Sequence, residues 1–176
     1  MVRIVVIAFF VFVSSFAIGQ KSLSGNLYRS IGLATNSEFD VFDANYGAQL
    51  VYQFDVNKIN WEAGVDIRVI DWGNQVGVFV GNNWDLYDKG KSNIAFNYRI
   101  HLNVPLFYND FLLGYGLSSN LSYNFNLFRS FDLKLGVGLR YDSVPGYRDY
   151  GPIFSTFELP ITLGIKKTLG GKETLE

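Results

Sequence analysis

The chain has 176 residues, a formal net charge of −1 and no cysteine. The near-zero charge gives no bulk attraction to nucleic acid, and the lack of cysteine excludes disulfides, thiolate chemistry and cysteine-rich zinc sites. Charged residues make up only 18% of the chain and aromatic residues 17%, a composition that favours a membrane β-barrel over a soluble globule.

Residues 1–19, MVRIVVIAFFVFVSSFAIG, have the three parts of an export signal. Arg3 supplies the positive charge, residues 4–13 form an uninterrupted apolar run, and Ala17-Ile18-Gly19 is a small-x-small cleavage site. The alternative, a retained membrane anchor, is disfavoured because the run is short. No later segment approaches the roughly 20 apolar residues of a membrane-spanning helix. The sequence therefore predicts a cleaved signal peptide and export from the cytoplasm.

The rest of the chain alternates between apolar and polar residues with a period of two, which is typical of strands with two unlike faces. The pattern is clearest at residues 93–107, NIAFNYRIHLNVPLF, where every second residue from Ile94 to Leu106 is apolar. It predicts eight strands, at residues 22–34, 46–56, 59–72, 75–87, 93–107, 112–123, 131–142 and 153–166. Turns are expected at 57–58, 88–91 and 124–130 at one end, and connections at 35–45, 71–74, 107–111 and 143–152 at the other.

Three residues conflict with this pattern. Arg29 shares a face with Leu27 and Ile31, where an arginine in contact with lipid costs about 2–4 kcal/mol at the midplane. A bulge or a position at the membrane rim is therefore expected at Arg29. Pro105 and Pro160 lie inside predicted strands of a closed barrel, which needs every backbone N–H. A bulge is expected at each proline, or a strand end at Pro105.

The composition of the polar face indicates which face meets lipid. Gly, Asn, Ser and Gln dominate it, which suits the narrow interior of an eight-stranded barrel. Aromatic residues near the strand ends have the form of interfacial girdles; they are Tyr46, Trp61, Trp84, Tyr123, Phe131 and Tyr141. The sequence therefore predicts an all-β fold, an eight-stranded antiparallel up-and-down transmembrane β-barrel over residues 20–170, followed by a polar tail at 171–176. The alternative is a soluble, lipocalin-like periplasmic barrel with its apolar face turned inward.

The signal sequence and the eight two-faced strands resemble the small outer-membrane β-barrel proteins, the class that includes the barrel of outer-membrane protein A. Segments such as FNYRIHLNVPLF and FELPITLGIKK are similar to the outer-membrane β-barrel families of Bacteroidetes-type bacteria. The resemblance implies a Gram-negative outer membrane, with outer-membrane lipid and the barrel assembly machinery as partners. Such barrels commonly end in an aromatic residue that this machinery reads, whereas this chain ends Thr174-Leu175-Glu176.

The predicted inner face carries charges of both signs. In a narrow interior of low dielectric these charges must be paired and hydrogen-bonded. We expect a structural network of salt bridges that plugs the barrel; the alternative is a gated ion path or a site for a small polar ligand. The residues are Glu62, Asp66, Arg68, Arg99, His101, Asp132, Lys134, Arg140, Glu158 and Lys166.

His101 is the sole histidine and therefore the one candidate for acid/base chemistry near neutral pH. Outer-membrane lipid A deacylases use a His-Ser-Glu arrangement that faces the lipid, whereas His101 falls on the lumen face and is followed two residues later by Asn103. One histidine also gives no multi-histidine metal site. We therefore expect no catalysis, no cofactor and no metal, and a structural or interaction role in which the loops at 36–45 and 143–152 supply any recognition.

Overall fold

The computed structural model describes residues 21–35, 45–69, 74–106, 112–128, 130–145 and 153–169. Within these ranges no helix is long and apolar enough to cross a membrane. The predicted signal peptide, the polar tail and most of the two predicted recognition loops lie outside the described residues. The described residues form eight strands: β1 (Lys21–Thr35), β2 (Asn45–Val56), β3 (Ile59–Val69), β4 (Gln75–Asp88), β5 (Ser92–Pro105), β6 (Gly114–Phe128), β7 (Phe131–Pro145) and β8 (Ile153–Leu169).

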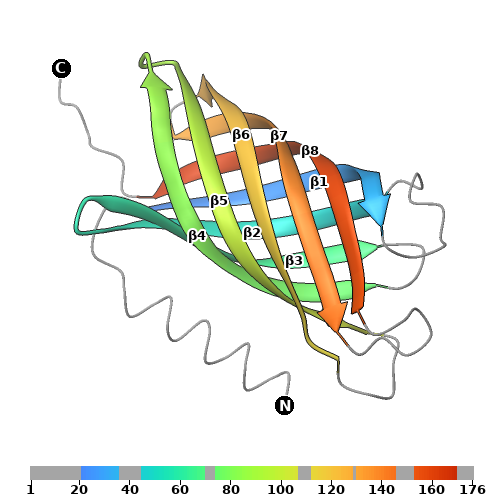
Figure 1. Cartoon of the computed structure of the whole chain (residues 1–176). Helices are drawn as coiled ribbons and strands as arrows, with labels where there is room; N and C mark the ends of the chain where they lie inside the picture. The colour runs from blue at the N-terminus through green and yellow to red at the C-terminus, as the bar shows by residue number, and fades with distance from the viewer. Residues whose placement is uncertain are drawn as a thin grey trace.

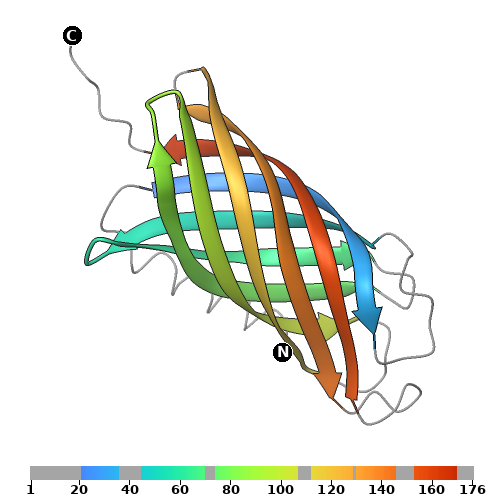
Figure 2. The same ribbon diagram turned by 45° about the horizontal axis from the view of Figure 1, so that its top comes forward.

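The eight strands close into one barrel (Figure 1). Each strand pairs antiparallel with its neighbours in sequence, and β1 also pairs with β8. Every strand therefore has a hydrogen-bonded neighbour on both sides. The strands run obliquely around the barrel, as Figure 2 shows from a second direction, because a closed sheet requires tilted, staggered strands. The predicted eight-stranded antiparallel up-and-down barrel is confirmed.

Short turns join the strands at one end of the barrel, called here the turn end; the opposite end is called the loop end. Between β2 and β3, Asn57 and Lys58 both have positive φ, 53° and 68°, as a two-residue hairpin turn matched to the strand twist requires. Gly90, with φ of 67°, serves the turn between β4 and β5. The turns predicted at 57–58 and 88–91 are thus where the sequence placed them.

The turn predicted at 124–130 is too long, because the connection between β6 and β7 is confined to residues 129–130. β6 continues to Phe128, and Asn124 pairs with Lys134 while Asn126 pairs with Asp132. The alternation also continues, because Asn124 is buried while Phe125 and Leu127 are exposed. The asparagines looked like turn residues but are part of the polar inner face. β7 and β8 likewise extend three residues beyond their predicted ends.

The residues in conflict with the pattern are each accommodated differently. Pro105 is the last residue of β5, which is the strand end expected there. Pro160 causes no register shift, so the bulge predicted at Pro160 is wrong. Instead, pairing of β7 with β8 stops after Val137↔Ile161 and resumes in the same register at Arg140↔Glu158. The missing N–H of Pro160 therefore leaves a gap in the ladder rather than a bulge.

Arg29 points outward from the middle of β1. It pairs with Tyr46, next to the first residue of β2, and its guanidinium lies 5.7 Å from the Tyr46 ring centroid. The register shift in β1 falls later, between Gly32 and Ala34. Arg29 pairs with Tyr46 and Ile161 without a register shift, so the bulge expected at Arg29 is wrong. It lies in the middle of β1 and pairs with the middle of β8, and its expected place at the membrane rim stays a prediction.

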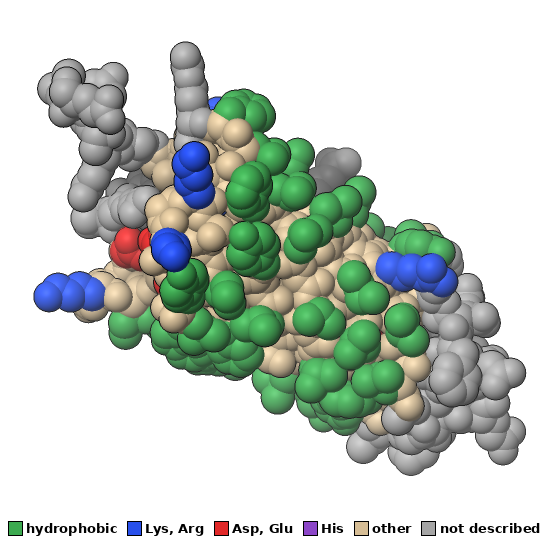
Figure 3. Space-filling model, turned by 90° about the horizontal axis from the view of Figure 1, so that it is seen from above, with side chains coloured by type: hydrophobic (Ala, Val, Ile, Leu, Met, Phe, Trp, Pro, Cys, Tyr) green, Lys and Arg blue, Asp and Glu red, His purple; other side chains and the backbone are tan. Residues whose placement is uncertain are grey.

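The two faces of the barrel wall differ sharply in composition. Leucine, isoleucine, valine and aromatic side chains are exposed on the outside of every strand, and Figure 3 shows them spread over the visible face with Lys and Arg at its two ends. Inside, buried polar and charged side chains outnumber buried apolar ones such as Val51 and Phe79. This distribution is the reverse of the lipocalin-like alternative, in which the apolar face would line the interior.

Candidate functional site

The structure places all eight of the principal predicted lumen residues inside the barrel, each 5% exposed or less. Asp132 and Lys166, also predicted for the inner face, are half-buried and pair with each other in register near the turn end. The eight buried residues are Glu62, Asp66, Arg68, Arg99, His101, Lys134, Arg140 and Glu158. They fall into two groups at different levels of the lumen.

The group near the loop end is built around two arginines and is called here the Arg68–Arg140 cluster. Arg68 binds both oxygens of Glu158 at 2.5 and 2.7 Å and Asp142 at 2.7 Å. Arg140 binds Asp66 at 2.5 Å and the same Asp142 oxygen as Arg68 at 2.6 Å. Asp142 therefore bridges the two guanidinium groups. Both Glu158 oxygens accept from the same Arg68 nitrogen, Nη2. Charge-assisted bonds of this length are among the strongest protein hydrogen bonds.

Neutral side chains complete the Arg68–Arg140 cluster. The Tyr28 hydroxyl donates to Asp66 at 2.9 Å, and Asn103 donates to Asp142 at 2.8 Å. Arg140 also lies 3.4 Å from the Tyr28 oxygen. Each buried carboxylate in the cluster therefore accepts bonds from more than one donor, which is what a charge removed from water requires.

The Arg68–Arg140 cluster spans the barrel from wall to wall. Arg68 and Asp66 lie on β3, whereas Arg140 and Asp142 lie on β7, and these strands are separated by three others in either direction around the sheet. Arg68 of β3 binds Asp142 of β7, and Arg140 of β7 binds Asp66 of β3. Each of the two opposite walls therefore supplies one cation and one carboxylate. The cluster closes the lumen at this level.

The second group lies nearer the middle of the barrel. Arg99 of β5 binds Glu62 of β3 at 2.5 Å and donates to Gln49 at 2.8 Å. Its guanidinium also lies 4.5 Å from the ring centroid of the buried Phe79, within cation–π range. Gln53 lies 3.4 Å from the second Glu62 oxygen.

His101 contacts a serine that the sequence did not indicate. Its Nε2 shares a hydrogen bond of 2.7 Å with Oγ of Ser118 on the neighbouring strand β6. Among the described residues its Nδ1 has no hydrogen-bond partner, so no carboxylate orients the ring as an acyl-transfer site requires. The Phe79 ring lies 5.5 Å from the imidazole on one side.

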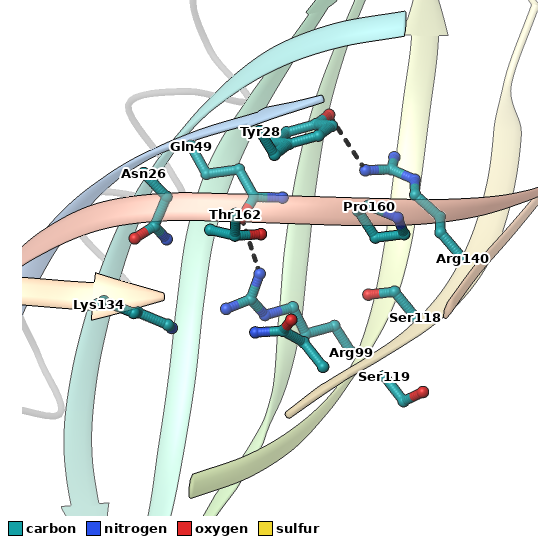
Figure 4. Close-up of a pocket in the computed structure, with 11 residues that line it drawn as sticks. Asn26, Tyr28, Gln49, Arg99, Ser118, Ser119, Lys134, Arg140, Pro160 and Thr162 are labelled. Atoms are coloured by element: carbon teal, nitrogen blue, oxygen red, sulfur yellow. Dashed lines mark hydrogen bonds between the residues drawn. The ribbon is translucent and has the colours of Figure 1, made fainter. Parts of the chain in front are cut away.

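Small cavities lie between side chains of the described residues, and two of them bear on the lumen. One, of about 20 Å³, lies in mid-lumen and is lined by residues of six strands, β1, β2, β5, β6, β7 and β8 (Figure 4). This volume is little more than a single water molecule needs. The other, of about 90 Å³, lies near the turn end beside Asp55, Asn60 and Asp85. Within the described ranges no group of three or more His, Asp or Glu side chains is arranged to hold a metal.

Tyr28 and Asp142 belong to the Arg68–Arg140 cluster but are absent from the predicted lumen residues. Both lie on the inner face by the same alternation that found the others: Asp142 is two residues after Arg140, and Tyr28 lies between Asn26 and Ser30. Asp142 is the last residue of its predicted strand, and tyrosine is usual on the outer face. Strict alternation along their strands places both residues on the inner face.

Fold and site together define a class: a closed eight-stranded antiparallel barrel with an apolar outer surface and a lumen sealed by ion pairs. Solved structures of outer-membrane proteins share this fold. Neisserial surface protein A matches with a TM-score of 0.63 at 10% identity, over 85% of this chain and 97% of that one. The outer membrane protein OprG from Pseudomonas aeruginosa matches with a TM-score of 0.55 at 9% identity, over 87% and 97% of the two chains.

No protein-family model and no curated protein sequence matches the chain. At 9–10% identity the two structural matches show the shared barrel fold. The chemistry of this chain must be argued from its own residues.

Proposed function

We propose that the protein is an integral β-barrel of a bacterial outer membrane with a structural or interaction role, and that it is neither an open channel nor an enzyme. The observation that carries the proposal is the inverted distribution of side chains. Apolar residues cover the outside of all eight strands, while ion-paired arginines and carboxylates fill the inside. Such an arrangement is stable in lipid, where a closed barrel satisfies every backbone group internally.

The sealed lumen argues against a resting channel. The Arg68–Arg140 cluster joins opposite walls, and the mid-lumen cavity has room for about one water molecule. Any recognition of a partner is then left to the connections at the loop end, including residues 36–45 and 143–152. Outer-membrane lipid and the assembly machinery are the partners that the proposal requires.

The His101–Ser118 contact does not support catalysis. Ser118 has a histidine within hydrogen-bonding distance, but His101 lacks an orienting group among the described residues, and both side chains face the lumen rather than the lipid. A lipid substrate could not enter a cavity of about 20 Å³. Unaltered lipid A on mass spectrometry after overexpression is the expected result.

The location is tested by fractionation. We expect the protein in the outer-membrane fraction, and we expect unheated samples to migrate differently from boiled samples on a denaturing gel, because a closed barrel resists detergent until it is heated. Recovery in the soluble periplasmic fraction would overturn the membrane assignment.

The closed lumen is tested separately by single-channel recording. Wild-type protein in planar bilayers is expected to give no steady conductance. In the double variant Glu62→Gln with Arg99→Met, the Arg68–Arg140 cluster remains, so conductance should stay absent. A steady current through the wild type would favour the narrow-channel alternative.

A further inference from the structure

The mid-lumen cavity has an unusual balance of charge. Among the described residues that line it, three are cations and none is a carboxylate: Arg99, Lys134 and Arg140 (Figure 4). Arg99 and Arg140 are already neutralised by Glu62, Asp66 and Asp142. Lys134 is the cation that lacks such a partner.

Lys134 is 3% exposed, yet among the described residues no carboxylate lies within ion-pair distance of its ammonium group. The charged groups that act on Lys134 are two cations, Arg99 and Lys166, and one carboxylate, Glu62. Glu62 is held by Arg99 at 2.5 Å. A buried ammonium without a counterion is costly, so this position calls for a negative charge.

A second observation points to the same place. Asn26, 3% exposed, lines the cavity, and neither polar atom of its side-chain amide has a hydrogen-bond partner among the described residues. Buried amides are nearly always bonded, so this pair of free atoms requires an explanation. Asn26 and Lys134 lie in the same row across the sheet, because Gly164 of β8 pairs with Lys134 of β7 on one side and with Asn26 of β1 on the other.

Gly164 explains why the space exists. A Cβ at this position would collide with the Asn26 side-chain oxygen. Glycine at this position therefore leaves room for the Asn26 amide, which lines the cavity together with Lys134 and has a free N–H donor. Ser118 and Thr162 bring further hydroxyl groups to the same cavity.

We propose that the cavity bounded by Lys134, Asn26 and Arg99 is a binding site for a single small monovalent anion of halide size. The volume of about 20 Å³ fits a monatomic ion little larger than water and excludes oxyanions such as sulfate or phosphate. The anion would neutralise Lys134 and accept the free N–H of Asn26. In this role it acts as a structural counterion that completes the polar plug.

The first test compares thermal unfolding of the folded protein, purified in a non-ionic detergent, in sodium chloride and in sodium gluconate of equal ionic strength. A ligand that binds only the folded state stabilises it, so chloride should raise the unfolding midpoint by at least about 2 °C. Equal midpoints in the two salts would overturn the proposal.

Two lysine variants locate the effect. Lys134→Met should lose the chloride dependence, because the charge that holds the anion is gone. Lys166→Met is the matched control: this lysine lines the turn-end cavity instead, and the variant should keep the full dependence. A dependence that survives in Lys134→Met would overturn the assignment to this cavity.

A measurement on the wild type covers the case in which Lys134→Met fails to fold. Crystals soaked in sodium bromide should show an anomalous difference peak next to the Lys134 ammonium and the Asn26 amide. Density at this position with no anomalous signal would mean that water fills the cavity, and the proposal would be wrong.

Discussion

At the scale of single residues, the lumen depends on matching each buried charge to a partner. Among the described residues, four buried cations face four buried carboxylates: Arg68, Arg99, Lys134 and Arg140 against Glu62, Asp66, Asp142 and Glu158. The match is uneven in space, because three of the carboxylates belong to the Arg68–Arg140 cluster. That cluster carries one excess negative charge, and the region around Lys134 carries one excess positive charge.

Arg140 should be among the residues most important for stability. Substitution Arg140→Met leaves Asp66 with only the Tyr28 hydroxyl and removes one of the two guanidinium groups on Asp142. Stranding a buried charge costs about 3–5 kcal/mol, so the free energy of unfolding, measured by urea titration of the protein folded into vesicles, should fall by about that amount.

Two further variants separate stranded charge from lost packing. Adding Asp66→Asn to Arg140→Met should recover part of the loss, because the stranded carboxylate is replaced by a neutral amide. Arg29→Met, on the outer face, removes an arginine that takes no part in the lumen ion pairs, so this variant should not lower stability. If the double variant recovers nothing, the ion pair is not what stabilises this level of the barrel.

The residues of the lumen were largely predictable, but their pairing was not. Strict alternation identifies the inward positions, including Arg68, Arg140 and Glu158, without any knowledge of the fold. Which arginine meets which carboxylate depends on the tilt and stagger of the closed sheet, which bring β3 and β7 face to face. No local sequence pattern encodes that stagger.

At the scale of strands, glycine makes room for large inward side chains. Gly47 of β2 pairs directly with Tyr28 of β1, and a Cβ at Gly47 would collide with the Tyr28 ring. The Tyr28 hydroxyl can reach Asp66 because the neighbouring position has no side chain. One outward glycine of the same strand pair, Gly25, has nothing within 4 Å of its would-be Cβ.

This contrast gives a matched pair of substitutions. Gly47→Val should lower the free energy of unfolding by about 1–3 kcal/mol, because the added side chain forces the Tyr28 ring out of place. Gly25→Val should leave stability unchanged or raise it by up to about 1 kcal/mol, since valine favours strands and meets no neighbour. Urea midpoints of the two variants measure the difference; equal midpoints would mean that the lumen can repack around Gly47.

The strands themselves were predicted better than their ends. A period of two identifies all eight, yet β6 continues five residues past its predicted end because Asn124 and Asn126 are inner-face residues as well as common turn residues. Pro160 shows a related limit: the sequence indicates a lost N–H, but only the register shows that the ladder has a gap and not a bulge. Composition alone does not distinguish these cases.

At the scale of the whole molecule, the outer surface is the feature that demands a lipid environment. Exposed apolar side chains run along all eight strands, far more than the scattered patches a monomer in water tolerates. In lipid the same surface is at no disadvantage. The depth of each position in the bilayer should then set the cost of placing a charge there.

Strand β5 and the residue that follows it offer a test within one segment. Ile100 is the middle of the outward set from Ile94 to Leu106, and both Ile100 and Leu106 are exposed, at 51% and 56%. Ile100→Arg should lower the free energy of folding into bilayers by about 2–4 kcal/mol, whereas Leu106→Arg at the rim should cost about 0–1 kcal/mol. The folded fraction in vesicles, followed by gel mobility of unheated samples across a urea series, gives both values.

Both variants add the same arginine to a position of similar exposure, so a difference between them reports depth in the hydrocarbon layer and not the loss of an apolar contact. Equal costs would show that Ile100 does not lie in the membrane interior, and would remove the physical basis for the proposed location.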